Sequence, residues 1–161
     1  MAYSKIRISI PNVTGNIVIT ATAEQSALPT NILDTVGYQN NKRISLSSAN
    51  SDKVVDAPGC CVTGQIPVAN GDVIRMKGYI CSNTYKGVAA AWNSSRAYIN
   101  GTNQNIAPSS NSGTYGTIVV DADSIVTWTI DNANIAYVSF SARCDDGSTL
   151  YVTKNEPLPS T

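Results

Sequence analysis

Aromatic and arginine side chains at alternating strand positions are the residues of this sequence with the most recognisable chemistry. Tyr79 and Tyr137 fall on the polar faces of two expected strands, and Trp92 ends a third strand just before a polar turn. Aromatic rings stack on sugar rings, while arginine and amide groups bind the hydroxyls. The sequence therefore predicts a glycan-binding surface formed by Tyr79, Trp92, Tyr137, Arg75 and Arg143.

Each of these side chains also has a purely structural interpretation. Trp92 shares a face with Val88 and Ala90, so it fits either the edge of the core or a stacking platform. Trp128 alternates in phase with two apolar neighbours, and we expect it in the core. Exposed tyrosines are common on protein surfaces that have no binding site.

The sequence offers few residues that could act in catalysis. The 161 residues include no histidine, which excludes Ser–His and Cys–His nucleophiles. A glycosidase needs two carboxylic acids that flank a cleft. The candidates lie in expected turns or near the chain ends: Asp121, Asp123, Asp145, Asp146, Glu24 and Glu156. We therefore expect no catalytic residues and no enzyme activity.

Metal and cofactor sites are not expected either. The chain has no glycine-rich phosphate loop, and its two aspartate-containing turns, 121–123 and 145–147, do not resemble an EF-hand. Neighbouring strand residues point to opposite faces, so Cys60 and Cys61 could not easily bind one metal. Free buried thiols are the favoured state of these cysteines and of Cys81 and Cys144, with a disulfide as the alternative outside the cell.

The composition sets the class of protein. Hydrophobic residues make up 42% of the chain, enough for a core that needs no disulfide or metal ion to stabilise it. Charged residues make up only 14%, below the usual fraction of a globular domain. Eleven basic residues balance eleven acidic ones. Because the sequence shows no basic stripe, nucleic-acid binding is not expected. No apolar run reaches the roughly 18–20 residues of a membrane span. The alternating N-terminus is unlike a signal peptide, so export by an ordinary signal is not expected.

Hydrophobic residues recur with a period of two along the whole chain, which predicts strands rather than helices. Polar loops are expected at 24–41, 48–58 and 100–114, and an Asn-Gly turn at 70–71 predicts a tight hairpin. About ten short strands joined by such turns predict an antiparallel β-sandwich, jelly-roll-like in topology. The expected strands are 6–10, 16–22, 43–47, 61–68, 73–80, 88–92, 96–99, 115–120, 125–130, 135–143 and 148–153.

From Asn31 onward the chain resembles a module of tail and fibre proteins of phages and prophages of Gram-positive bacteria. The segments that carry the resemblance are 37–38, 42–45, 62–68, 71–75, 136–140 and 151–157. It implies a β-sandwich over residues 26–161 that is similar to carbohydrate-binding modules.

The N-terminal segment, residues 8–23, resembles the last hairpin of an immunoglobulin-like domain, without the rest of that domain. Two strands alone are marginally stable in water. Residues 1–25 are therefore expected to dock on the sandwich, to pair with another copy, or to belong to a truncated parent.

These observations lead to one functional expectation and two alternatives. The expectation is a virion surface protein (a tail fibre, baseplate or head-decoration protein) that binds host-surface or mucosal glycans. Its partners would be other virion proteins and copies of itself, with a trimer favoured. One alternative is a structural virion protein that self-assembles through its N-terminal strands; the other is the binding module of a glycoside hydrolase.

Overall fold

The computed structural model describes residue 15 and residues 28–45, 53–82, 84–99, 104–106, 111–113, 116–144 and 150–159. The expected N-terminal hairpin, apart from Gly15, lies outside these residues, as does the turn at 145–147. The elements are α1 (Leu33–Val36), β1 (Tyr38–Ile44), β2 (Val54–Thr63), β3 (Ile66–Pro67), β4 (Val73–Lys77), β5 (Tyr79–Ile80), β6 (Gly87–Trp92), β7 (Gln104–Ile106), β8 (Asn111–Gly113), β9 (Gly116–Val120), β10 (Val126–Thr129), β11 (Tyr137–Cys144) and β12 (Tyr151–Lys154).

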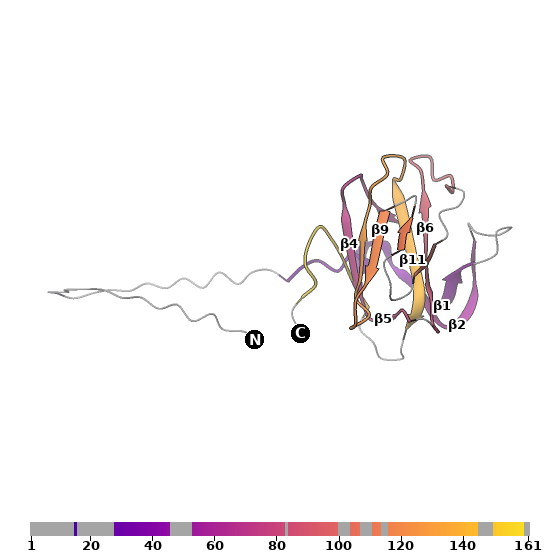
Figure 1. The fold of residues 1–161 in the computed structure, drawn as a ribbon, viewed down its shortest axis with the longest axis horizontal. Helices are drawn as coiled ribbons and strands as arrows, with labels where there is room; N and C mark the ends of the chain where they lie inside the picture. Colours follow the sequence, from indigo (N-terminus) through magenta and orange to yellow (C-terminus); the bar gives the residue numbers. More distant parts are fainter. Residues whose placement is uncertain are drawn as a thin grey trace.

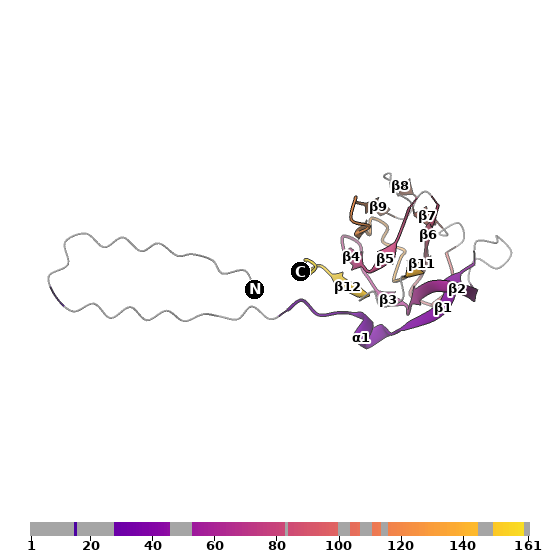
Figure 2. The same cartoon turned by 90° about the horizontal axis from the view of Figure 1, so that it is seen from below.

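The strands form two antiparallel sheets that pack face to face (Figures 1 and 2). The large sheet has the order β1-β2-β11-β6-β7, and β3 and β5 also pair with β11. The small sheet has the order β12-β4-β10-β9-β8. The chain passes repeatedly from one sheet to the other, so strands distant in sequence become neighbours. The predicted jelly-roll-like β-sandwich is confirmed.

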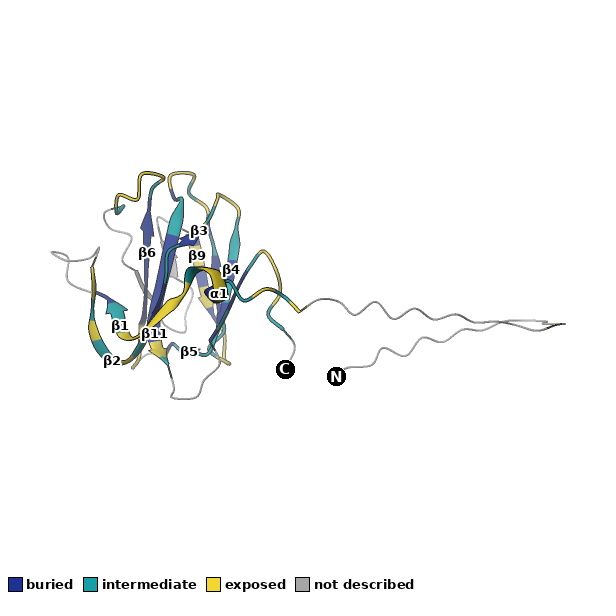
Figure 3. Cartoon of the chain, turned by 180° about the vertical axis from the view of Figure 1, so that it is seen from behind, coloured by how far each residue is buried: buried dark blue, intermediate teal, exposed yellow. Residues whose placement is uncertain are grey.

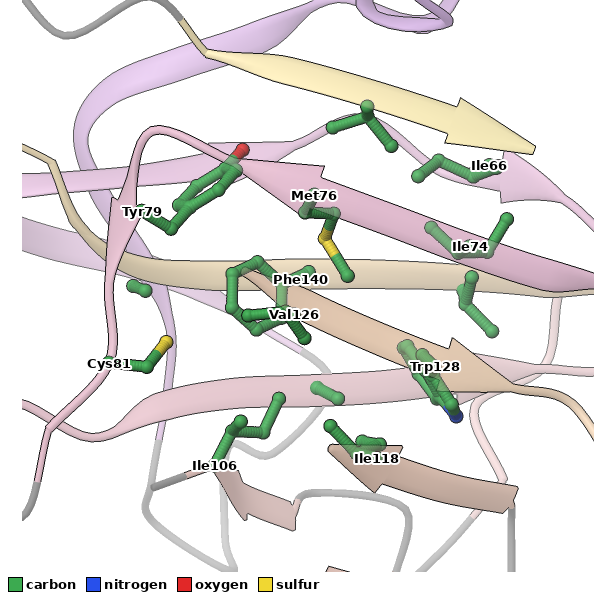
Figure 4. Close-up of a cluster of buried hydrophobic side chains, with 14 of the residues drawn as sticks. Ile66, Ile74, Met76, Tyr79, Cys81, Ile106, Ile118, Val126, Trp128 and Phe140 are labelled. Atoms are coloured by element: carbon green, nitrogen blue, oxygen red, sulfur yellow. The ribbon is translucent and has the colours of Figure 1, made fainter. Parts of the chain in front are cut away.

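The core between the sheets follows from the alternation of apolar residues along the strands. In β4, Ile74 and Met76 are buried and their neighbours are not, and in β10 Trp128 is 2% exposed, as expected for a core residue. Phe140 of β11 faces them from the large sheet (Figure 4). Each fully buried apolar side chain of this size contributes about 1.5–3 kcal/mol. This core holds the two sheets together and fixes which faces point outward.

Gly78 interrupts the alternation and moves the chain from the small sheet to the large one. Its φ of +86° is a conformation that favours glycine, and after it Tyr79 and Ile80 pair with β11 instead of continuing β4. Tyr79 therefore points inward and is only 1% exposed (Figure 4). The expectation of an exposed Tyr79 is wrong, because it assumed one strand through 73–80.

A second apolar cluster lies on the outer face of the large sheet. There the β1–β2 hairpin curls over β11 and β6, and the backbone N–H of Ile44 donates to Ser141 Oγ at 3.1 Å. The register shift between Asn40 and Lys42 marks the bend, since bulges of this kind increase the local twist. The buried members of this outer cluster are Ile44, Val62, Val88, Ala90 and Trp92.

Several expected boundaries are corrected by pairing that local sequence does not reveal. β2 begins at Val54, inside the loop expected at 48–58, and β7 and β8 lie inside the loop expected at 100–114. Segments such as these become strands because neighbouring strands supply partners for their backbone groups. Conversely, the strand expected at 96–99 is reduced to a single bridge between Trp92 and Tyr98.

Cys61 and Cys144 form a disulfide between β2 and β11, with their Cα atoms 5.9 Å apart. Because Ala142 pairs with Cys61, Cys144 lies on the same inner face two residues further along β11. The expectation of four free thiols is therefore corrected. Cys60 and Cys81 remain free, and burial raises the pKa of the Cys81 thiol to about 12, which makes it unreactive.

The described part of the chain contains little helix. α1 has four residues and ends at Gly37, within the segment expected to be irregular. No helix in the described ranges has the length and apolar character needed to span a bilayer.

Candidate functional site

Three aromatic side chains lie in register across the outer face of the large sheet. Tyr137 of β11 is the cross-strand partner of Trp92 of β6, and Trp92 in turn forms an antiparallel bridge with Tyr98. Residues directly opposite each other in antiparallel strands project from the same face, about 5 Å apart. Tyr98 and Tyr137 pack against the outer cluster from its margin. We call these three residues the aromatic row.

Trp92 is the buried member of the aromatic row and supports the other two. It is 8% exposed, and its ring meets that of Tyr98 at 66° with centroids 6.1 Å apart. Tyr98 and Tyr137 are half-buried, so part of each ring reaches solvent. Of the two roles left open for Trp92, burial favours the core edge, and the accessible ring surface belongs to the two tyrosines.

Arg96 covers the Tyr137 end of the row. Its guanidinium carbon lies 4.5 Å from the centre of the Tyr137 ring, and its Nη1 donates to Gln65 Oε1 at 2.7 Å. A guanidinium over an aromatic face is attracted by the ring quadrupole. No acidic side chain in the described ranges forms an ion pair with Arg96. The guanidinium is therefore oriented by two contacts at the surface, without a carboxylate partner in the described ranges.

Arg96 belongs to a tight turn that follows β6. Asn93 Oδ1 accepts the N–H groups of Ser95 and Ala97, both at 3.0 Å, and the N–H of Arg96 donates to the Asn93 carbonyl at 2.9 Å. Arg96 itself has a φ of +59°, which costs a residue with a Cβ roughly 1–2 kcal/mol. The side-chain contacts of Arg96 are thus made from a strained backbone position.

A pocket of about 540 Å³ opens beside Tyr98, next to the turn that follows β6. Its walls come from the connection after β6 and the connection before β11, which the bond from Ala136 N–H to the Trp92 carbonyl joins at 2.9 Å. Figure 3 shows that β6 is buried along its length, whereas the turn after it is exposed. The lining residues are Asn93, Ser94, Tyr98, Ile99, Ala133, Asn134 and Ala136.

The polar groups of this pocket are amides and a hydroxyl. Asn93 directs its Oδ1 into the turn, and no residue of the described ranges accepts a hydrogen bond from its Nδ2. The side chains of Ser94 and Asn134 likewise form no hydrogen bond within those ranges. Together with the Tyr98 ring, the pocket combines an aromatic surface with neutral donors and acceptors.

The structure separates the residues that the sequence grouped into one surface. Only Trp92 and Tyr137 come together. Arg75 lies on the outer face of the small sheet and donates to the Glu156 carbonyl at 3.1 Å. The guanidinium carbon of Arg143 lies 4.3 Å from the centre of the Tyr85 ring. Arg143 lies six residues beyond Tyr137 in β11, which corresponds to roughly 20 Å along the strand.

Sequence reasoning missed Tyr98, Arg96 and the pocket amides. A signal for Tyr98 was available, because the Asn-Ser-Ser-Arg turn at 93–96 is a hairpin sequence that pairs Trp92 with Tyr98. Nothing in the local pattern indicates that Arg96 reaches across to Tyr137 or to Gln65. Those contacts depend on how β3, β6 and β11 pair.

Within the described ranges, no three His, Cys, Asp or Glu side chains lie close enough together to bind one metal ion. Asp121 instead has a structural role: its Oδ1 accepts the N–H groups of Asp123 at 3.0 Å and Ile125 at 2.8 Å. These are the bonds of an ordinary aspartate turn.

Comparison with known proteins finds no matching family model and no significant match among curated proteins or solved structures.

Proposed function

We propose that this chain is a glycan-binding module displayed on a phage virion, as part of a tail fibre, a baseplate or a head decoration. The glycan-binding part of the proposal rests on the site geometry. The virion part rests on the resemblance of residues 31–157 to phage tail modules.

One observation carries the proposal: the half-buried ring of Tyr98 forms a wall of a pocket whose polar groups are neutral amides and a hydroxyl. A sugar offers an apolar ring face and a rim of hydroxyls, and this pocket offers a complement to each. Its volume of about 540 Å³ falls within the range of small-ligand sites and suits one or two sugar rings.

The support beneath Tyr98 also fits this function. The Tyr98 ring rests against the buried Trp92, and the turn at 93–96 is closed by three hydrogen bonds. A ring already fixed in this way loses little conformational entropy when a ligand stacks on it. One shallow site of this size binds weakly, and display in many copies on one particle would raise the avidity.

The test of glycan binding is a screen of the full chain against immobilised host-surface and mucosal glycans, followed by NMR titration of the hits. We expect Tyr98→Ala to weaken binding at least tenfold, because it removes the stacking surface. Tyr85→Ala is the matched control: it removes a tyrosine that is 44% exposed at the Arg143 end of the sheet, and it should leave the affinity unchanged.

Two outcomes would overturn the proposed binding function. One is the absence of binding to any glycan at millimolar concentrations of the folded protein. The other is binding that Tyr98→Ala leaves intact in a variant with the wild-type circular dichroism spectrum. For the virion part, electron microscopy of purified phage particles with an antibody against the chain should label a particle surface, and unlabelled particles would refute it.

A further inference from the structure

We infer that the glycan carries an oxyanion, as a carboxylate or a sulfate ester, and that Arg96 binds this group. The inference rests on the proposed glycan-binding function and specifies the class of ligand.

The first observation is that the Arg96 guanidinium is held in place and has hydrogen-bonding capacity to spare. Its Cζ lies over the Tyr137 ring, 4.5 Å from the ring centre, and Gln65 accepts a hydrogen bond from Nη1. No other described residue accepts from the remaining N–H groups, and no carboxylate of the described ranges neutralises the charge. A planar guanidinium with free donors matches the two oxygens of a carboxylate or sulfate.

The second observation comes from a turn of the same construction elsewhere in the molecule. Between β9 and β10, Asp121 Oδ1 accepts from residues 123 and 125, and Ser124 N–H donates to the Asp121 carbonyl at 3.2 Å. Ser124 has a φ of +61°, almost the same as the +59° of Arg96. Closing the turn therefore does not require arginine, and Gly or Asn would suit the backbone better. The long cationic side chain at position 96 is explained by its reach over Tyr137.

The third observation is the position of Arg96 relative to the pocket. Asn93 and Ser94, which line the pocket, belong to the same four-residue turn as Arg96. Tyr98 and Tyr137 are separated by two strand spacings, roughly 10 Å. An oligosaccharide with one ring on Tyr98 can therefore extend along the aromatic row and present a charged substituent to Arg96.

Arg143 provides a matched comparison within the same sheet. It also stacks on a tyrosine, 4.3 Å from the centre of the Tyr85 ring, and it is also exposed. Its strand partners are Cys60 and Ile80, and it lies at the far end of β11 from the pocket. Arg143→Asn therefore removes the same charge from the protein without changing the aromatic row.

The experiment compares charged glycans with neutral partners of the same backbone. The probes are oligogalacturonides against their methyl esters, for a carboxylate, and chondroitin sulfate oligosaccharides against their desulfated forms, for a sulfate. In low-salt buffer, isothermal titration of the full chain should show at least one charged probe binding ten or more times tighter than its partner. Added salt should reduce this difference, because the contact is partly exposed.

The variants assign the effect to one residue. Arg96→Asn should bring the affinity for the charged probe down to that for its neutral partner, while Arg143→Asn should leave it unchanged. Because Asn tolerates a positive φ, Arg96→Asn should also melt at or above the wild-type Tm, which separates lost binding from lost folding.

The possible failures point to different conclusions. If charged and neutral probes bind equally and Tyr98→Ala abolishes both, the inference about Arg96 fails while the glycan-binding function stands. If charged probes bind and Arg143→Asn removes that binding instead, the anion site is assigned wrongly. If neither the probes nor the wider glycan screen gives binding, the proposed function fails and this inference fails with it.

Discussion

The ring of Tyr79 meets the ring of Phe140 edge-on, with centroids 4.8 Å apart and an interplanar angle of 89°. This contact lies in the core, and burial raises the pKa of the Tyr79 phenol well above its ordinary value. The hydroxyl is buried, and no residue that the structure describes forms a hydrogen bond with it. An unsatisfied buried hydroxyl costs about 1–3 kcal/mol. We therefore predict that Tyr79→Phe raises the free energy of unfolding by about 1 kcal/mol in urea denaturation.

Tyr79→Ala provides the contrast to this substitution. It removes the ring that packs on Phe140 and should lower the free energy of unfolding by about 3–5 kcal/mol. If Tyr79→Phe destabilised the protein instead, the hydroxyl would have to be bonded in solution.

Tyr79 also shows how far the sequence could predict the fold. Alternation alone correctly placed Trp128 in the core, because its strand continues without interruption. The same rule failed at Tyr79, because Gly78 passes the chain to the other sheet and reverses the phase. A single glycine in an apolar run is compatible with a bulge as well as with a change of sheet, so the sequence alone did not reveal the change. β7 and β8 were missed because they are short polar segments, which become strands by pairing their backbone groups with β6 and β9.

For the site, the sequence identified aromatic residues but not their arrangement. Trp92 and Tyr137 were both selected, and they come together because β6 ends at Trp92 beside Tyr137, where β11 begins. Arg143 was grouped with Tyr137 because they share a face of one strand, although the length of β11 separates them. Arg96 could not be selected, because its contacts with Gln65 and Tyr137 arise only after three strands have paired.

The disulfide between Cys61 and Cys144 leads to a chemical prediction. Alkylation of the denatured, unreduced protein should modify two of the four cysteines, Cys60 and Cys81, as measured by mass spectrometry. Reduction should lower the free energy of unfolding by about 2–4 kcal/mol, since the bond restricts the unfolded chain over a sequence separation of 83 residues. Cys60→Ser should change neither result, and modification of all four thiols without reductant would contradict the pairing.

Gly116 is predicted to tolerate no side chain. Its φ is +128°, and a Cβ there would collide with the Thr129 carbonyl oxygen and come within 3.0 Å of Trp128 Nε1. Gly116→Ala should lower the free energy of unfolding by about 1–3 kcal/mol, measured by chemical denaturation. Gly59→Asn is the control, because a Cβ at Gly59 meets nothing within 4 Å and Asn accepts its φ of +76°. Equal losses in both variants would mean that backbone conformation alone, without the collision, sets the cost.

The two tryptophans should report differently on the proposed ligand. Trp92 contacts Tyr98 in the aromatic row, whereas Trp128 is enclosed between the sheets. Glycan binding should therefore shift the fluorescence of the wild type and of Trp128→Phe, but not of Trp92→Phe. Each variant must first show a cooperative melt. A shift that is lost in Trp128→Phe and kept in Trp92→Phe would place the ligand away from the row.

Acid stability is predicted to depend on Asp72, at the turn before β4. Burial opposes ionisation of this carboxyl, but hydrogen bonds from Asn155 Nδ2 at 2.7 Å and Ala69 N–H at 2.8 Å, with the nearby charge of Lys154, outweigh it. Together they hold the pKa of Asp72 below its ordinary value of 3.8. A carboxyl whose pKa is lower in the folded state stabilises the protein above its unfolded pKa, and this contribution is lost as the pH falls through the folded value.

The resulting experiment compares urea denaturation at pH 7 and at several values below pH 4. Asp72→Asn should cost about 1 kcal/mol at pH 7, through weaker hydrogen bonds, and should lose less stability than the wild type on acidification. Lys154→Met should also reduce the loss of stability on acidification, but by a smaller amount. The charge of Lys154 lowers the pKa of Asp72 less than either of the two hydrogen bonds does. Parallel acid limbs for the wild type and Asp72→Asn would show that Asp72 has the same pKa in the folded and unfolded chains, contrary to the bonds it accepts.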